Sequence, residues 1–259
     1  MDATKTHNLQ DAISVANSNF CNPDHLEFNN YMPWDYVIHE GVLAGARSMR
    51  LSPQWGLKHN TQTNDGGEHK AMLYPDFATL LITSGEDSLG NPTLVSRVLM
   101  LIEIKRMISE ALDDRDCQLG LAKDQVIEQC QYAFHEDINI SRIVIVACSG
   151  PWWTYQNIHR NELLPLSDYY DPTYDPSYGD DGQDDEDQDD DGLVHLAIQE
   201  WSPPFDLRTP QGLQKLLELR PILEQIKDKL DGGTEKSTLC AFQWVIAKLQ
   251  AVFGRRTGA

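Results

Sequence analysis

Runs of apolar residues in the middle of the chain predict a set of buried strands. Three runs, Phe77–Thr83, Val95–Ile104 and Ile140–Cys148, are rich in leucine and β-branched residues and have the length of a strand covered on both faces. Between the second and third runs, apolar residues recur on one face of Lys123–Phe134, which predicts a helix. After a turn, the pattern of Trp152–Ile158 is typical of a hairpin partner for the third strand.

The residues before these runs predict helix, loop and a short strand. A short helix is expected around Leu9–Ala16, and apolar positions recur at roughly helical spacing within Pro33–Met49. The segment Gln54–Glu68 has the composition of a loop, and Ala71–Tyr74 leads by a short strand pattern into the first apolar run. The resulting order is helix, strand, strand, helix, strand, strand, which predicts a mixed α/β fold around one sheet.

The composition changes after residue 160 to aspartate, tyrosine, proline and glycine. We interpret residues 161–192 as a long excursion whose acidic part is disordered. Leu193–Trp201 has the pattern of one more strand, and Thr209–Pro210 predicts an N-cap followed by proline at the first helical position. That helix is expected to run toward Leu230, with an interruption at Pro221.

A second C-terminal helix is expected after Gly232–Gly233, from Thr234 or Ser237 to about Phe253. The two C-terminal helices would either cover the sheet or form the surface of a homodimer. The chain then divides into an N-terminal extension (1–32), a core (33–160), the acidic excursion (161–192) and a C-terminal strand and helices that complete the same domain (193–259).

The net charge limits the kind of partner that the chain can bind. The formal net charge is −19, and nine acidic residues between 180 and 191 contribute nearly half of it. Such a charge disfavours a broad nucleic-acid-binding surface. A narrow cleft that holds a metal ion is compatible with it, because charges are screened over about 8 Å at physiological salt.

Three further features favour an intracellular protein, cytoplasmic or nuclear, with no membrane partner. No apolar run approaches the roughly 18 residues of a membrane span. The first twenty residues lack the basic start and apolar centre of a signal peptide. The five cysteines are scattered and form no C-x-x-C pair, which argues against a disulfide framework or a zinc site.

Candidate chemistry lies at the ends of the first two predicted strands. Asp76 precedes one strand, and Glu103 and Lys105 end the next. Because side chains alternate along a strand, Glu103 and Lys105 project from the same face. If the strands are neighbours, Asp76 and Glu103 converge, and paired carboxylates with open water positions suit Mg²⁺ or Mn²⁺. The ordinary alternatives are a turn aspartate at 76 and a solvated strand end at 103–105.

Pro75-Asp76, followed by a strand, a loop and Glu103-Ile104-Lys105, resembles the motif of the PD-(D/E)XK nuclease superfamily. The resemblance covers residues 33–160 and implies a restriction-endonuclease-like fold, with a mixed central sheet flanked by helices. It also implies that Asp76, Glu103 and the backbone carbonyl of Ile104 bind the metal, while Lys105 serves the attacking water. A second nominal match, Glu68-His69-Lys70, has no apolar strand before it.

The resemblance assigns supporting roles to residues outside this motif. In the helix after it, Gln129 would assist catalysis, with Gln125 and Gln131 as alternatives, and Tyr132 would face the substrate. Glu40, from the helix before the first strand, would add a metal-binding carboxylate. We also assign Trp152, Trp153 and Arg106 to substrate binding, although packing against the tyrosine-rich excursion is the simpler role for the two tryptophans.

Two functions from different classes fit these observations. The first is a Mg²⁺- or Mn²⁺-dependent nuclease that hydrolyses phosphodiester bonds, with DNA favoured over RNA. The second is a catalytically inactive module on the same fold, whose acidic surface recruits a basic protein. The two differ in whether the chain binds a divalent cation through Asp76.

Overall fold

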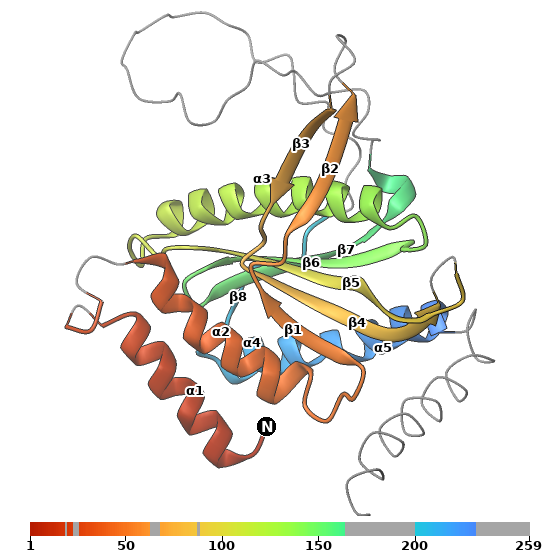
Figure 1. Ribbon diagram of the computed structural model, residues 1–259. Helices are drawn as coiled ribbons and strands as arrows, with labels where there is room; N and C mark the ends of the chain where they lie inside the picture. Colours follow the sequence, from red (N-terminus) through yellow and green to blue (C-terminus); the bar gives the residue numbers. More distant parts are fainter. Residues whose placement is uncertain (19, 23–25, 63–67, 87–88, 164–199, 232–259) are drawn as a thin grey trace, which may run out of the picture.

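The structure is a computed structural model that describes residues 1–231 except 19, 23–25, 63–67, 87–88 and 164–199. A six-stranded mixed sheet forms its centre, and helices cover both faces (Figure 1). In sheet order the strands are β1 (Met49–Pro53), β4 (Phe77–Glu86), β5 (Pro92–Lys105), β6 (Arg142–Ser149), β7 (Trp152–His159) and β8 (Phe205–Asp206). The predicted mixed α/β sheet flanked by helices is therefore confirmed.

One pair of neighbouring strands is parallel, and the others are antiparallel. The parallel pair, β5 and β6, needs a crossover connection, and the long helix α3 (Leu112–Glu136) provides it. The helix predicted over 123–134 begins earlier because two acidic residues, Asp113 and Asp114, occupy its first turn and favour the positive end of the helix dipole. A 3₁₀ turn, η3 (Arg160–Glu162), follows β7.

The alternation of side chains along β5 and β6 separates two hydrophobic cores. One face of the sheet presents Ile102, Ile104 and Val146 to a core that also contains residues of the N-terminal helices and of the helices after β8. The opposite face presents residues such as Leu101 and Ile145 to α3. Side chains at 103 and 105 therefore lie on the α3 face, where a polar group is surrounded by apolar neighbours.

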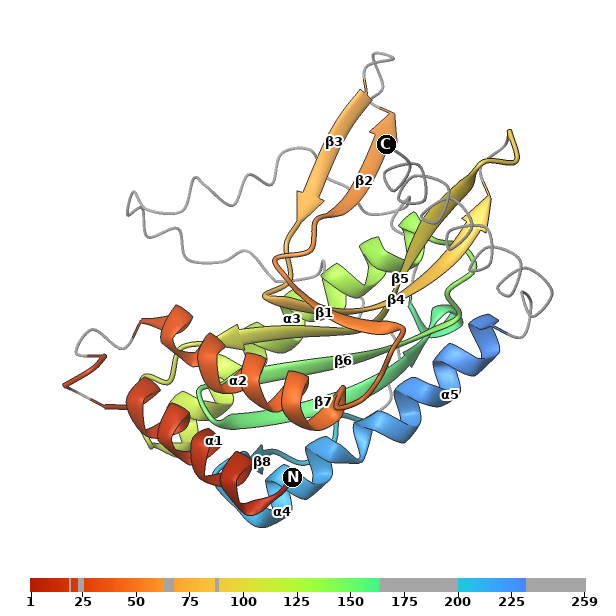
Figure 2. The ribbon, with the colours of Figure 1, turned by 60° about the horizontal axis from the view of Figure 1, so that its bottom comes forward.

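The segment 54–68, which we expected to be a loop, forms part of a hairpin instead. Its strands are β2 (Leu57–Gln62) and β3 (Glu68–Leu73), which pair with each other and with no other described strand, and project from the body on the side of α3 (Figures 1 and 2). Leu57 is fully buried at the base of the hairpin. Strand β2 and the first half of β3 were missed because residues 58–62 and 68–70 are polar, so no apolar alternation marks them. The second half of β3 lies within the short strand predicted over Ala71–Tyr74.

The N-terminal helices pack under the sheet. Helix α1 (Ala3–Ala16) is capped by Asp2, whose side chain accepts a hydrogen bond from the backbone N–H of Lys5. The expected helix over 33–49 starts earlier and stops sooner, because Gly45, at φ 75°, turns the chain toward β1. Its three parts are the 3₁₀ turn η1 (Glu27–Asn30), helix α2 (Tyr31–Val37) and the π turn η2 (Ile38–Val42).

The C-terminal helix begins and breaks as expected. Thr209 accepts a hydrogen bond from the N–H of Gly212 and caps α4 (Pro210–Leu217). A second helix, α5 (Leu219–Asp231), follows directly. The break falls there because Pro221 has no N–H to donate to the carbonyl of Leu217.

Several expectations fall outside the part of the chain that the structure describes. They are the disordered acidic tract and most of the predicted strand (both within 164–199) and the last helix (within 232–259). Among the described helices, none is both long and apolar enough to cross a membrane.

Candidate metal-binding site

The register of β4 and β5 brings Asp76 next to the end of β5. The two strands are antiparallel, and Phe77 lies opposite Ile102. Asp76 therefore stands beside the next residues of β5, and its Oδ2 accepts a hydrogen bond of 2.7 Å from the backbone N–H of Ile104. The side chain of Ile104 is fully buried on the other face of the sheet. The predicted neighbours at 76 and 103–105 thus share one end of the sheet.

Glu103 is the centre of a polar cluster between β5 and α3. Its Oε1 lies 2.8 Å from Nζ of Lys105, and its Oε2 accepts a 2.9 Å hydrogen bond from Nε2 of Gln129. Lys105 also donates to Oε1 of Gln125 at 2.6 Å. Gln125 and Gln129 are one turn apart on α3, so a single helix face meets both residues of the strand. The two glutamines named from the sequence are both in the cluster.

Burial makes the negative charge in this cluster costly. Glu103 is only 2% exposed and Asp76 only 6%, whereas the side chain of Lys105 retains 19% exposure. Burial, together with the neighbouring charge of Asp76, raises the pKa of Glu103 to about 7 against the opposing effect of Lys105. Burial also raises the pKa of Asp76. One lysine therefore compensates two buried carboxylates incompletely.

Two residues that the sequence did not indicate complete the cluster. The hydroxyl of Tyr31, the first residue of α2, donates a hydrogen bond to Oδ1 of Asp76. Glu27 begins η1, which packs against β5, and its carboxylate accepts a hydrogen bond from the backbone N–H of Arg106. Burial raises the pKa of Glu27, and Asp76 adds to that effect while Lys105 opposes it. The i, i+4 spacing of Glu27 and Tyr31 was the only local signal for their shared position.

The structure does not bring Glu40 to this cluster. Its carboxylate is bound by Lys5 of α1 at 2.6 Å and by His39 at 3.2 Å, and about a third of its side chain is exposed. The reason is the π turn η2, which continues α2 and directs Glu40 toward α1. Glu27, rather than Glu40, is the carboxylate that the N-terminal segment places near Asp76.

Two of the residues assigned to substrate binding are buried instead. Trp153 is fully buried, with its ring against Trp34 and Phe205, so no face is free to stack on a base. Tyr132 is 3% exposed within the core under α3. Both assignments are therefore corrected: these aromatic rings stabilise the two cores of the sheet.

The other two residues lie near the site surface. Arg106 is exposed and follows Lys105 directly. Trp152 is half-buried, and the guanidinium groups of Arg115 and Arg208 lie 4.9 and 5.6 Å from the centre of its ring. Since β6 pairs Ser149 with both Lys105 and Trp152, the tryptophan lies two strands from the lysine at the same end of the sheet. Cation–π contacts of this kind fix the indole in place.

The donor set can be tested for a divalent cation. Within the described residues, no group of three or more His, Cys, Asp or Glu side chains is arranged to hold a metal ion. A cation here would therefore use Asp76 and Glu103 as its two carboxylates, and backbone carbonyl and water oxygens for the rest, which is a usual arrangement for Mg²⁺. Gln129 Oε1 is buried and has no hydrogen-bond partner among the residues that the structure describes, so a polar atom beside Glu103 is left unsatisfied. A hydrated cation would compensate the negative charge of Asp76 and Glu103, and its water molecules could donate to Gln129 Oε1.

Comparisons with known proteins add no relative. No family model matches the chain, and neither a curated protein nor a solved structure is similar to it. What the cluster can do chemically therefore follows from its own side chains and from their resemblance to a known motif.

Proposed function

We propose that this protein is a divalent-metal-dependent nuclease that hydrolyses phosphodiester bonds of DNA or RNA, with Asp76 and Glu103 as ligands of Mg²⁺ or Mn²⁺. One observation carries the proposal. Asp76, just before β4, and Glu103, in the neighbouring strand β5, are both buried at one end of the sheet, and a single lysine is their only cation among the hydrogen bonds and ion pairs of the described residues. Such an arrangement is unfavourable for folding and typical of a site that binds a cation.

The arrangement of elements supports membership of the PD-(D/E)XK superfamily and its restriction-endonuclease-like fold. The aspartate stands at the start of β4, and the Glu-x-Lys motif ends the neighbouring strand β5. The helix that follows the motif presents Gln129 to the glutamate. The resemblance implies these relative positions of the aspartate, the Glu-x-Lys motif and the glutamine within residues 33–160. A chance match of the short motifs alone would not place them in this way.

The protein's own side chains would divide the work as follows. Bound Mg²⁺ or Mn²⁺ supplies Lewis acidity toward a phosphate oxygen and lowers the pKa of a water molecule. Lys105 is the most exposed of the central residues, and its ammonium group, held by Glu103 and Gln125, is placed to orient the attacking water. Gln129 holds Glu103 through Nε2 and leaves Oε1 as an acceptor for water.

Glu27 is the best candidate for the additional carboxylate that the resemblance places in the helix before the first strand. Its pKa responds to both Asp76 and Lys105, so it lies within the electrostatic field of the site. Its role would be to hold water around the cation rather than to complete a ring of protein ligands, in keeping with the absence of a three-residue cluster among the described side chains.

The inactive-module alternative has one observation in its favour. Lys105 already has two partners, Glu103 and Gln125, so the polar groups of the cluster are largely satisfied by one another. In that case the acidic surface, with a chain charge of −19, would bind a basic protein and the cluster would be a remnant. Binding of Mn²⁺ distinguishes the two functions.

The test measures Mn²⁺ binding by calorimetry and the cleavage of single- and double-stranded DNA and RNA with Mg²⁺ or Mn²⁺. Asp76→Asn and Glu103→Gln keep the size of each side chain and remove its charge, so both should abolish Mn²⁺ binding and lower cleavage by at least about 10³-fold. Glu110→Gln is the matched control, because it removes a carboxylate that pairs with Arg208 outside the site. It should leave both measurements unchanged.

Each outcome has a distinct meaning. Mn²⁺ binding and cleavage that depend on Asp76 and Glu103 support the nuclease. If the wild type neither binds Mn²⁺ nor cleaves any of the four substrates, the nuclease proposal fails and the inactive module is favoured. Cleavage that survives in Asp76→Asn and Glu103→Gln would place the activity elsewhere in the chain.

A further inference from the structure

Tyr31 has a relationship to Asp76 that the proposed roles do not use. Asp76 accepts one hydrogen bond at each carboxylate oxygen, from the Tyr31 hydroxyl at Oδ1 and from the Ile104 N–H at Oδ2. Two donors on opposite oxygens fix both the position and the rotation of a carboxylate. One of them belongs to the backbone of the metal-binding motif, and the other comes from a helix 45 residues earlier in the chain.

The ring of Tyr31 is itself held in place by the strand that carries the aspartate. It lies edge-on to Phe77, with ring centroids 5.5 Å apart and an interplanar angle of 66°. Phe77 is buried and is the first residue of β4, directly after Asp76. The tyrosine therefore contacts two consecutive residues, one through its ring and one through its hydroxyl.

The phenol hydroxyl can hold the carboxylate without displacing a cation. A carboxylate oxygen has two lone pairs, so Oδ1 can accept this hydrogen bond and still bind a cation. A hydrogen-bond donor on a ligand carboxylate orients that carboxylate for the metal. Loss of such a donor typically lowers metal affinity by roughly 10–100-fold.

We infer that Tyr31 is a positioning residue of the metal site: its hydroxyl holds Asp76 Oδ1 in the orientation that binds the divalent cation. The inference rests on the proposed function, since it requires that Asp76 bind a cation. It gives the N-terminal segment a part in the site, because η1 and α2 deliver Glu27 and Tyr31 together.

The experiment compares Tyr31→Phe with Tyr36→Phe in the full chain. Both changes remove one hydroxyl from helix α2. Tyr31→Phe keeps the ring contact with Phe77 and loses the bond to Asp76, whereas the Tyr36 hydroxyl bonds Asn8 of α1, away from the site. The readouts are the Kd for Mn²⁺ by calorimetry, kcat and KM for cleavage, and the thermal melting midpoint.

We expect Tyr31→Phe to raise the Kd for Mn²⁺ by about 10-fold or more and to lower kcat with little change in KM, while Tyr36→Phe leaves all three values unchanged. A merely structural role would lower the melting midpoint and leave the Kd of the folded protein as it was. A second measurement needs no variant: binding of Mn²⁺ to the wild type should perturb the near-ultraviolet absorption of a tyrosine, and Tyr36→Phe should keep that signal.

The outcomes separate this inference from the proposed function. If the wild type binds Mn²⁺ through Asp76 but Tyr31→Phe binds it equally well, Tyr31 does not position the ligand and the nuclease proposal stands. If Tyr31→Phe does not fold, the absence of a tyrosine signal on Mn²⁺ binding to the wild type overturns the inference. If the wild type binds no Mn²⁺, both fail.

Discussion

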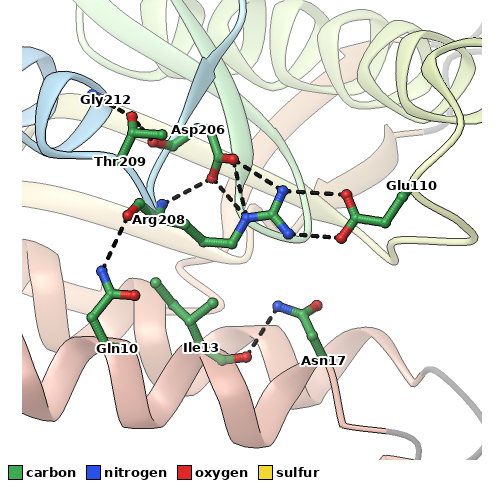
Figure 3. A network of polar contacts seen from close by, with 8 residues as sticks. All are labelled: Gln10, Ile13, Asn17, Glu110, Asp206, Arg208, Thr209 and Gly212. Carbon is green, nitrogen blue, oxygen red and sulfur yellow. Dashed lines mark hydrogen bonds and ion pairs between the residues drawn. The ribbon is translucent and has the colours of Figure 1, made fainter.

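Apart from Glu27 at the edge of the first, the cluster around Glu103 and the network around Arg208 contain the same number of charged groups and have opposite properties. Each places two carboxylates beside one cation: Asp76 and Glu103 beside Lys105, and Asp206 and Glu110 beside Arg208 (Figure 3). The guanidinium donates to Glu110 at 2.7 Å and lies 2.9 Å from Asp206. Glu110 is 61% exposed, however, whereas the Glu103 side chain is 3% exposed.

The difference in exposure decides what each cluster does. Where one of the two carboxylates, Glu110, reaches solvent, both stabilise the guanidinium, and they raise the pKa of Arg208 above its ordinary value. The network then joins distant parts of the chain, since Gln10 of α1 bonds the Arg208 carbonyl and Asp206 precedes α4 (Figure 3). In the buried cluster the same composition raises the pKa of the carboxylates instead. One arrangement holds the fold together, and the other keeps a charge that a cation would stabilise.

The largest difference should appear when the two cations are removed. Lys105→Met should lower metal-dependent cleavage by about 10²–10³-fold, because no ammonium group remains to orient the water. Arg208→Met should leave kcat of the folded protein nearly unchanged, since Arg208 has no bond to the Glu103 cluster. Initial rates with saturating Mn²⁺ measure both. Equal loss in the two variants would remove the distinction between a site and a structural network.

The pH dependence of stability should show which carboxylates carry the unfavourable charge. The pKa of Glu103 is raised to about 7 in the folded protein, above its ordinary value of 4.5. The folded state thus holds this proton more tightly than the unfolded chain does. The stabilisation of the folded state by protonated Glu103 is fully present below pH 4.5 and is lost as the pH rises through 7.

Glu103→Gln has no such proton to lose. Between pH 4.5 and 8, its free energy of unfolding should therefore rise relative to that of the wild type by up to roughly 3 kcal/mol. Urea unfolding at several pH values, with chelator present to remove metal, gives this difference. Glu110→Gln is the control and should follow the wild type. If the free energies of unfolding of wild type and Glu103→Gln change with pH in parallel, burial does not make the charge of Glu103 unfavourable.

A smaller effect is expected from the geometry of the Arg208 network. Arg208→Met should lower the free energy of unfolding by about 1–2 kcal/mol, because Asp206 and Glu110 lose a forked donor and half-buried Trp152 loses a cation above its ring. Arg208→Lys keeps the charge and should recover less than half of the loss, since an ammonium group cannot form the paired bonds. Full recovery by lysine would show that charge alone matters here.

The sequence predicted the framework of the site because apolar runs dominate that region. Phe77–Thr83 and Val95–Ile104 could be placed as strands from composition, and alternation then put Glu103 and Lys105 on one face. The prediction also assumed that these two strands are neighbours, and β4 and β5 do pair with each other, in antiparallel register. Gln129 of α3 was assigned by the family resemblance, and Gln125 by its position one helical turn earlier on the same face.

Other parts of the site depend on tertiary contacts that no local pattern records. Glu27 begins the turn η1 and Tyr31 begins α2, and only the packing of this segment against β5 brings them to Asp76. Trp153 is buried because Trp34 and Phe205 come from distant segments to cover it. Strand β2 and the first half of β3 were missed for a local reason, since their polar residues resemble a loop, whereas the second half of β3 was predicted within Ala71–Tyr74.

The smallest effect on stability and on Mn²⁺ binding should come from breaking a further carboxylate–cation pair, Lys5 and Glu40. Its atoms are 2.6 Å apart, closer than those of Lys105 and Glu103, yet each side chain is about one third exposed. If burial rather than distance sets the importance of a pair, Glu40→Gln should leave both the melting midpoint and the Kd for Mn²⁺ unchanged. Glu27→Gln, in the half-buried position near Asp76, is the matched comparison and should weaken Mn²⁺ binding measurably. A loss of Mn²⁺ affinity in Glu40→Gln but not in Glu27→Gln would reverse their roles and require η2 to rearrange when the cation binds.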